Sequence, residues 1–280
     1  MKVQGLGSVA AAVRAGGAIP AVTIYNLEGL RACIGAAQRT GTVVIIQVSP
    51  SFLPWLKSTL LGPQLAQIVS SAPAQLGLHL DHARELSDVA TAIAWGFTSV
   101  MVDGSELPLE ENIALVKDAA TSAHRAGLAI EAELGPSLGP EDRLTELAVR
   151  SSLTDPSQAV AFVEATQVDA LAVAIGNQHG QYRGPARLDF RRLRAIADQI
   201  DIPLVLHGAS GLSSQALRRC VSLGVGKVNF NTELRRLHFQ AFSQAAAQGQ
   251  LDTLHAMEDA FHLMRAFVEG QIATLRGKQQ

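Results

Sequence analysis

The sequence predicts a closed (β/α)8 barrel, and three observations lead to this fold class. Eight short apolar runs of strand length recur along the 280 residues. Segments with helical spacing of apolar residues separate these runs. Several of the helical segments end on a glycine shortly before the next run, as helix C-termini often do. Eight such alternations in a chain of this length are typical of one barrel domain, which we expect to span residues 1–280.

Most of the eight runs are continuously apolar, as parallel strands covered on both faces are. The alternative is an open doubly wound sheet, but that fold normally uses fewer strands, and no Gly-x-Gly-x-x-Gly turn follows the first run. The expected strands are Ala18–Ile24, Val43–Val48, Leu76–Asp81, Ser99–Asp103, Ala129–Leu134, Ala170–Ile175, Pro203–His207 and Lys227–Thr232.

The helical segments follow the 3.6-residue period, and Asp155-Pro156 and Ser213 supply N-terminal signals for two of them. The long stretch 50–73 should contain a further helix near Gln64–Ser70. Residues 237–280 indicate a C-terminal helical extension whose apolar face packs on the barrel, forms a dimer contact, or does both. The remaining expected helices are Glu28–Arg39, Leu86–Trp95, Leu109–His124, Gln158–Thr166, Phe190–Gln199 and Ser213–Leu223.

Composition excludes several classes of protein. A formal net charge of −2 without a long charge run argues against binding to nucleic acid or to an anionic membrane surface. No stretch has the length and apolar character of a membrane span or a signal peptide. The two cysteines, Cys33 and Cys220, form no C-x-x-C pair, so we expect a soluble protein of the reducing cytoplasm.

Histidines collect at the carboxyl ends of the expected strands, where barrels of this class place their active sites. His82 follows the third strand, His179 the sixth, and His207 ends the seventh. One such histidine is more often a hydrogen-bonded structural residue, but three imidazoles with an open position form a familiar catalytic zinc set. His79 lies inside the third strand, so we expect it either in the core or behind a metal ligand, without contact to the metal.

Asp81 stands beside one of these histidines at a strand tip. It is a candidate general acid/base, and the alternatives are a helix N-cap or a residue that orients a ligand. Two further tips, Gly208–Gly211 and Asn229–Thr232, follow strands seven and eight, where barrels often bind phosphate through backbone N–H groups. The same glycines could also simply form tight turns.

Seven motifs in this order resemble those of class II fructose-bisphosphate and tagatose-bisphosphate aldolases, especially the tagatose-type branch. The resemblance runs from about residue 18 to residue 234. Its motifs are LHLDH (78–82), MVDGS (101–105), EAELG (131–135), LTDP (153–156), VDALAVAIGNQHGQY (168–182), PLVLHGASG (203–211) and KVNFNTEL (227–234).

The resemblance implies a zinc ion bound by His82, His179 and His207, with Asp81 handling the proton on the aldehyde oxygen. It implies that dihydroxyacetone phosphate is held by the set Ser49, Gly180, Gly208, Ala209, Ser210, Asn229, Phe230, Asn231 and Thr232. A monovalent cation, Na⁺ or K⁺, often accompanies that site. Asp103 and Glu133 would form a second, deeper metal site or a hydrogen-bonded core pair, and Glu141 would exchange the proton on the substrate carbon.

The expected reaction is reversible, metal-dependent cleavage of a ketose (bis)phosphate, in which zinc stabilises the enediolate as a Lewis acid. No lysine ends an expected strand at the rim, since Lys227 begins strand eight, so a Schiff base is not required. Thr23 stands where the family usually has asparagine, Ser49-Pro50-Ser51-Phe52 replaces a glycine-rich turn, and Arg265 is the nearest basic residue for a second phosphate.

The departures at Thr23 and at 50–52 keep open a non-catalytic phosphosugar-binding subunit of an aldolase. The three rim histidines also permit a metal-dependent hydrolase on the same fold, although the phosphate-binding turns would then be unexplained. The expected partner is a small phosphosugar substrate. We also expect a homo-oligomer, either a dimer or a tetramer.

Overall fold

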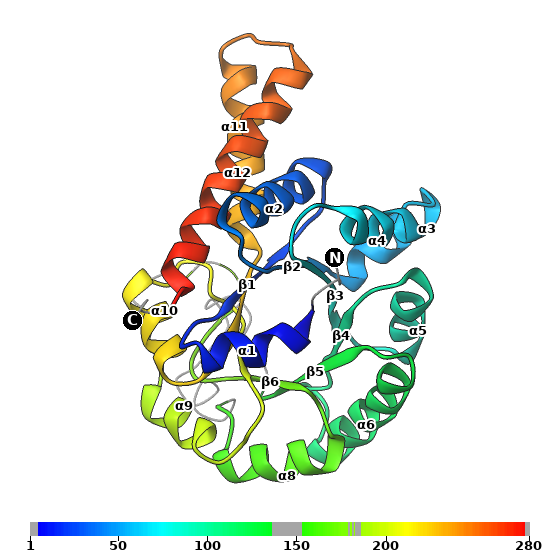
Figure 1. Ribbon diagram of the computed structural model, residues 1–280, viewed down its shortest axis with the longest axis vertical. Coiled ribbons are helices and arrows are strands. Elements are labelled where there is room, and N and C mark those ends of the chain that lie inside the picture. The colour runs from blue at the N-terminus through cyan, green and yellow to red at the C-terminus, as the bar shows by residue number, and fades with distance from the viewer. Residues whose placement is uncertain (1–4, 136–152, 179, 181, 183–185, 278–280) are drawn as a thin grey trace.

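The computed structural model confirms the predicted (β/α)8 barrel. It describes residues 5–135, 153–178, 180, 182 and 186–277. Eight parallel strands pair in sequence order, and β8 closes the ring on β1 (Figure 1). The strands are β1 (Ile19–Thr23), β2 (Val44–Val48), β3 (Leu76–Ala83), β4 (Ser99–Val102), β5 (Ala129–Leu134), β6 (Ala170–Val173), β7 (Leu204–Leu206) and β8 (Val225–Phe230).

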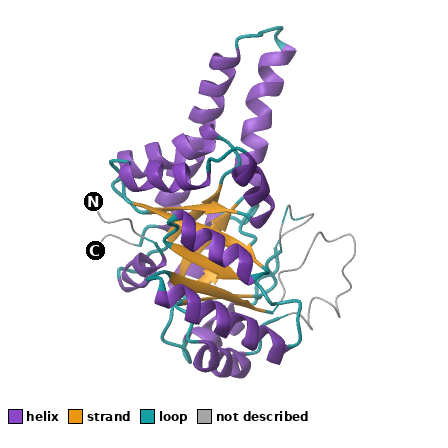
Figure 2. Cartoon of the chain, turned by 90° about the vertical axis from the view of Figure 1, so that its right-hand side faces the viewer, coloured by secondary structure: helices purple, strands orange, loops and turns teal. Residues whose placement is uncertain are grey.

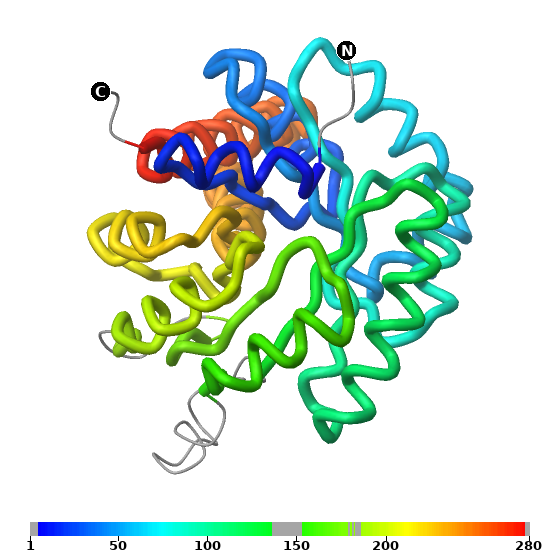
Figure 3. The backbone as a smooth tube through the Cα atoms, turned by 60° about the horizontal axis from the view of Figure 1, so that its bottom comes forward, coloured from blue at the N-terminus to red at the C-terminus, as the bar shows by residue number. Residues whose placement is uncertain are grey.

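Helices surround the ring on its outer side (Figures 1 and 3). The predicted helix near Gln64–Ser70 is α4 (Gly62–Ser71), which follows η2 (Pro50–Phe52) and α3 (Leu53–Ser58). The others around the barrel are α2 (Leu27–Thr40), α5 (Leu86–Trp95), α6 (Leu109–Arg125), α8 (Pro156–Thr166), α9 (Phe190–Ala197) and α10 (Ser214–Ser222). None of the described helices is long and apolar enough to cross a membrane.

Two apolar clusters form the core. The larger one fills the space between the outer faces of the strands and the surrounding helices. The smaller one lies inside the ring, where Ile19, Ala21 and Ile45 meet Leu6 and Val9. These last two residues belong to η1 (Leu6–Ser8) and α1 (Val9–Arg14), a helical segment the sequence did not predict, which lies across the amino-terminal opening of the barrel (Figure 1). The barrel is therefore closed at this end, and the opposite mouth is left for a site.

The predicted boundaries of strand eight were wrong. The strand begins two residues earlier, at Val225, and ends at Phe230, while Thr232 already begins α11. Lys227 consequently lies within β8, fully buried, with Nζ 2.8 Å from Glu131 Oε2. It occupies the barrel interior, not the start of the strand as the sequence suggested, because the buried carboxylate of Glu131 pairs with its charge there.

The C-terminal extension is an antiparallel pair of helices, α11 (Thr232–Ala247) and α12 (Thr253–Leu275). Its first helix begins five residues before the predicted boundary at Leu237. One end of the pair packs against α2, where Arg31 and Arg39 form ion pairs with Glu258 and Glu269. The other end projects well beyond the barrel (Figures 1 and 2). The exposed apolar residues Phe239 and Leu254 lie on these helices, and Leu251 lies in the segment that joins them. The dimer contact predicted for this extension stays a prediction.

Candidate active site

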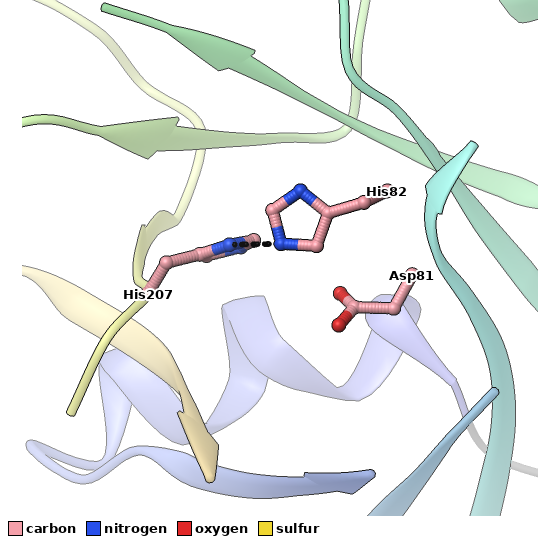
Figure 4. A group of neighbouring side chains, drawn as sticks. All are labelled: Asp81, His82 and His207. Atoms are coloured by element: carbon pink, nitrogen blue, oxygen red, sulfur yellow. Dashed lines mark hydrogen bonds between the residues drawn. The ribbon is translucent and has the colours of Figure 1, made fainter. Parts of the chain in front are cut away.

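The carboxyl ends of β3 and β7 bring Asp81, His82 and His207 together at the open mouth of the barrel (Figure 4). Each of the three offers one possible ligand atom, and these atoms lie within 4.8 Å of one another. Asp81 and His207 are almost completely buried, whereas His82 keeps 23% of its side-chain surface exposed. The group is thus set into the barrel mouth and still open to solvent on one side.

A β-bulge explains how two consecutive residues of β3 both reach this site. Neighbours in a regular strand point to opposite faces, so Asp81 and His82 should diverge. In β3 the pairing with β4 shifts between Leu80 and Ala83, which face Val100 and Val102. His82 also adopts φ +58°, a left-handed conformation that is uncommon for a residue with a side chain. The bulge extends β3 beyond its predicted end at Asp81 and turns His82 into the mouth.

Carboxylates orient both imidazole rings. His82 Nδ1 lies 2.9 Å from Asp103 Oδ2, and His207 Nε2 lies 2.8 Å from Glu131 Oε1. The other two nitrogens, His82 Nε2 and His207 Nδ1, face each other at 3.0 Å (Figure 4). Without a metal ion one of these two nitrogens donates to the other. When both N–H groups are directed at the carboxylates, the two facing nitrogens can instead present lone pairs to a metal ion, which is the usual arrangement of histidines that ligate a metal. The residues present therefore fit a zinc ion.

A buried ion pair lies directly beneath His207. Glu131 accepts from Lys227 through one carboxylate oxygen at 2.8 Å and contacts His207 with the other. Both members of the pair are fully buried. His79 lies in the same interior, bonded to Ser99, and burial lowers its pKa well below the ordinary value, so it is neutral. Glu131 is thus held on two sides, and its contact with His207 is fixed.

Asp81 receives two amide donors on the same oxygen. Gln47 Nε2 donates to Oδ1 at 2.7 Å, and Asn229 Nδ2 donates to it at 3.2 Å. Asp81 is therefore a positioned acceptor, and it is not the helix N-cap considered from the sequence, since the N-cap residue of α5 is Glu85.

The electrostatics of the rim favour a protonated His82 in the metal-free protein. Burial by itself would lower the pKa of this histidine, but the charge of Asp81 and the bond to Asp103 raise it to about 9. Burial likewise opposes ionisation of Asp103, yet its bonds to His82 and Ser105 hold its pKa below the ordinary value. This is an anionic environment that attracts a cation, whether a proton or a metal ion.

The turn after β7 depends on glycine. Gly208 has φ +60°, and a Cβ at this position would lie 2.1 Å from the carbonyl oxygen of Gln178. Tyr182 donates through its hydroxyl to the carbonyl of Gly208 at 2.9 Å and accepts from the backbone N–H of Gln178 at 3.0 Å. Ser210 donates to Glu233 at 2.5 Å. The turn is thereby held against the segment after β6 and against the first turn of α11.

A cavity of about 210 Å³ opens beside Asp81 and His82. Tips of several strands contribute to it, and it holds most of the residues expected to bind phosphosugar. Its described lining is Thr23, Tyr25, Ser49, Pro50, Asp81, His82, Gly180, Gly208, Ser210, Asn229, Asn231, Thr232 and Arg235.

Two of the residues expected to bind phosphosugar do not line this cavity, and two other predicted site residues lie outside the described residues. Phe230 is buried and packs edge-on against Phe267, with ring centroids 5.7 Å apart, so its side chain faces the outer core. Ala209 is also buried in the outer core cluster. His179 and Glu141 lie outside the described residues.

Asp103 and Glu133, the predicted second metal site, lie near His82 Nδ1, at 2.9 Å and 3.7 Å. Together with His82 they could hold a metal ion. Because His82 Nδ1 already contacts Asp103 at hydrogen-bond distance, the geometry favours Asp103 as a residue that orients His82.

Sequence reasoning missed two polar residues that support the site, Gln47 and Glu131. Both lie in apolar runs. Because side chains alternate between the two faces of a strand, Glu131 lies on the same interior face as Glu133. A polar residue inside a buried strand needs a partner, and this signal could have identified both. It also missed Arg235, because the early start of α11 was not predicted.

Comparison with known proteins agrees with the fold. The family model described as fructose-bisphosphate aldolase class-II matches residues 4–280. The YdjI aldolase of Escherichia coli K12 is 31% identical, with a TM-score of 0.86 and 100% of both chains covered. A candidate fructose-1,6-bisphosphate aldolase of Coccidioides immitis is 32% identical, with a TM-score of 0.85 and 96% of this chain and 95% of that chain covered.

The fold alone is shared with the fructose-bisphosphate aldolase of Campylobacter jejuni, at 22% identity, a TM-score of 0.82, and 96% and 93% coverage of this chain and that chain. The closed barrel and the cluster of polar residues at its open mouth are those of a (β/α)8-barrel enzyme. The family match over nearly the whole sequence is more specific: the chain belongs to the class II fructose-bisphosphate aldolase family. The predicted family is therefore confirmed, and aldolase activity, that of a lyase, is supported.

Proposed function

We propose that this protein is a zinc-dependent aldolase that reversibly cleaves a ketose phosphate or bisphosphate to dihydroxyacetone phosphate and an aldehyde. The observation that supports this best is the facing pair of ring nitrogens in His82 and His207, 3.0 Å apart, each ring oriented by a carboxylate. Asp81 stands beside this pair, and a cavity adjoins it. Metal ligands, an acid/base and room for substrate thus occur at one barrel mouth.

In this proposal His82 and His207 hold the zinc ion with His179, whose place lies outside the described residues. A zinc ion bound there supplies Lewis-acid stabilisation of negative charge on substrate oxygens. The chain contributes the ring orientation: Asp103 and Glu131 each fix one nitrogen, so that the opposite nitrogen of each histidine is presented as a ligand.

Asp81 transfers the proton at the aldehyde oxygen. Gln47 and Asn229 both donate to Oδ1, so in the described structure Oδ2 is the oxygen left for proton transfer. In the cleavage direction the carboxylate accepts the proton of the substrate hydroxyl. In the condensation direction the same group returns the proton to the product hydroxyl, in accord with general acid–base catalysis.

Dihydroxyacetone phosphate would be bound between the turns after β6, β7 and β8. Gly180, Gly208 and Ser210 line one part of the cavity, and Asn231 and Thr232 line another, at the start of α11. Backbone N–H groups at a helix N-terminus are suited to a phosphate group. Ser49 lines the same cavity from the tip of β2. The role of Glu141 in carbon proton exchange, the monovalent cation and the homo-oligomer remain predictions from the resemblance.

Proton exchange tests the proposal without a second substrate. Zinc-loaded protein is incubated with dihydroxyacetone phosphate in heavy water, and loss of the hydroxymethyl proton signal is followed by NMR. We expect exchange that a chelator abolishes and added zinc restores. His207→Asn should lose exchange, whereas His255→Asn, on the exposed surface of α12, is the matched control and should retain it.

Absence of exchange in zinc-loaded protein would refute the proposed reaction. Tight binding of dihydroxyacetone phosphate without exchange would instead favour the non-catalytic phosphosugar-binding alternative. Hydrolysis of a phosphate ester would favour the metal-dependent hydrolase.

A further inference from the structure

An apolar cavity of about 220 Å³ adjoins the catalytic cavity at the barrel mouth. It is bounded by α2, α3 and α4, and none of its described lining residues is charged. Its inner wall includes the buried side chains of Leu30, Leu56 and Leu65, whereas Trp55 and Ile68 stand at its rim. Metal ligation, proton transfer and phosphate binding make no use of such a surface, so its role is unassigned.

Tyr25 connects the apolar cavity with the catalytic one. Among the described residues it is the one that lines both cavities. Its hydroxyl accepts from Nδ2 of Asn231, which lines the catalytic cavity, at 3.4 Å. Its ring centroid lies 5.9 Å from that of Phe52, which lines the apolar cavity. A ligand that leaves the catalytic cavity across the Tyr25 ring therefore enters an apolar environment.

A row of aromatic rings continues from Tyr25 to the rim. Phe52 stacks on Trp55, with ring centroids 5.0 Å apart and an angle of 14° between the planes. Phe52 ends η2, whose start is fixed by Ser49, which accepts from the backbone N–H of Ser51. Since Ser49 follows β2 directly, the same strand that carries Gln47 to Asp81 also positions this row.

Large apolar side chains remain exposed around the opening of this cavity. Trp55, Leu61 and Ile68 are 50%, 41% and 43% exposed. Apolar residues clustered around an uncharged concave site are typical of a site that binds an apolar group. Small-molecule sites usually have about 300–1,000 Å³. The catalytic cavity of about 210 Å³ is below that range, whereas the two adjoining cavities together fall within it.

We infer that the apolar cavity binds the tail of an aldehyde substrate that carries an alkyl or aryl group at the end remote from the reacting carbon. In condensation, the hydroxymethyl carbon of dihydroxyacetone phosphate loses a proton and forms a bond to the aldehyde carbon, whose oxygen takes up a proton. The tail takes no part in this step and contributes binding alone. The inference rests on the proposed aldolase function and deepens it, because it names the chemical class of the second substrate.

The test compares unbranched aldehydes in condensation with saturating dihydroxyacetone phosphate, using zinc-loaded full-length protein. The series is propanal, butanal, pentanal and hexanal. Burial of each added methylene should raise kcat/KM about two- to fourfold, mainly through KM. From propanal to hexanal the wild type should therefore gain roughly 10- to 60-fold. A neutral hydroxylated aldehyde, glyceraldehyde, should have a lower kcat/KM than hexanal.

Trp55→Ala removes part of the apolar rim, so it should lower the ratio of kcat/KM between hexanal and propanal by roughly 3- to 10-fold. Trp55→Phe keeps an apolar ring and should restore part of the ratio. Leu86→Ala is the matched control, because Leu86 is a similarly exposed apolar residue, on α5, that lines neither cavity. It should keep the wild-type ratio.

A binding measurement is independent of turnover. The chain has two tryptophans, and Trp95 lines neither cavity, so Trp95→Phe leaves Trp55 as the single emitter. 1-Hexanol has the same tail as hexanal but no aldehyde group. It should shift the emission of Trp55 to shorter wavelengths and should inhibit the condensation of hexanal competitively.

Several results would overturn the inference. The wild type could show no dependence on chain length, or a preference for glyceraldehyde over hexanal. 1-Hexanol could leave the emission of Trp55 unchanged. Light scattering could show that Trp55→Ala dissociates an oligomer, which would assign the apolar opening to a subunit interface. Failure of the proposed function is distinguishable, because the wild type would then show no proton exchange with dihydroxyacetone phosphate alone.

Discussion

Replacement of Glu131 by glutamine should weaken metal binding and destabilise the barrel, and the two effects can be separated. The carboxylate is fully buried and contacts His207 and Lys227, both at 2.8 Å. In Glu131→Gln the amide nitrogen would face one of these two donors, and the ammonium group of Lys227 would lose its counter-charge. Removing one partner of a buried ion pair typically costs about 3–5 kcal/mol. Loss of a residue that orients a metal ligand typically lowers metal affinity about 10- to 100-fold.

The assay pairs urea unfolding in excess chelator with zinc competition against a chromophoric chelator. The double variant Glu131→Gln, Lys227→Met also removes the unpaired ammonium, so it should recover much of the free energy of unfolding. It should not recover zinc affinity, because His207 still lacks its carboxylate. Unchanged zinc affinity in the single variant would refute the reasoning. Recovery of both properties in the double variant would show that Glu131 acts only through folding.

Three further predictions concern the rim. Gly208→Ala should lower the free energy of unfolding by more than about 1 kcal/mol, since its Cβ would lie 2.1 Å from the Gln178 carbonyl oxygen. The control is Gly249→Ala, because Gly249 has φ +69° and open space around it. Equal changes in Tm for the two variants would contradict this account. Asp81→Asn should lower kcat about 10²- to 10⁴-fold, because the amide cannot transfer the proton. The Tm should change little, because Asn can still accept the hydrogen bond from Gln47 at Oδ1. Near-wild-type turnover of this variant would exclude Asp81 as the acid/base. His82 has its pKa raised from 6.5 to about 9, so its protonated form stabilises the metal-free protein fully below pH 6.5 and this stabilisation is lost as pH rises through about 9. The Tm in chelator should fall over that window, and zinc affinity should decrease as pH drops below about 9, because metal must displace the proton; a flat profile in both measurements would contradict this.

The order of the barrel elements could be predicted because each of them is encoded locally. Parallel strands read as apolar runs, and the helices between them carry their own period and end signals. The two rim histidines that the structure describes, His82 and His207, could be placed at one mouth because every strand of such a barrel ends on the same side. These features can be predicted without knowing how neighbouring strands pair.

Features that depend on pairing could not be predicted in the same way. The bulge at Asp81 and His82 is defined by the pairing of β3 with β4, and the amino-acid sequence of β3 alone does not indicate the extra residue. The partner of Lys227 lies 96 positions away in sequence. Arg235 reaches the cavity because α11 starts at Thr232, and its place over Tyr25 depends on how that helix leaves β8.

The bulge in β3 has a consequence for anyone who would transplant this chemistry. A regular strand offers an inward position only at every second residue. Here two consecutive residues, Asp81 and His82, serve the same site, and the backbone conformation at φ +58° makes this possible. Copying the two side chains onto an ordinary strand would send one of them into the outer core. A designer would have to transfer the extra residue together with its pairing to β4. The site therefore depends on a backbone irregularity as much as on the identity of the two amino acids.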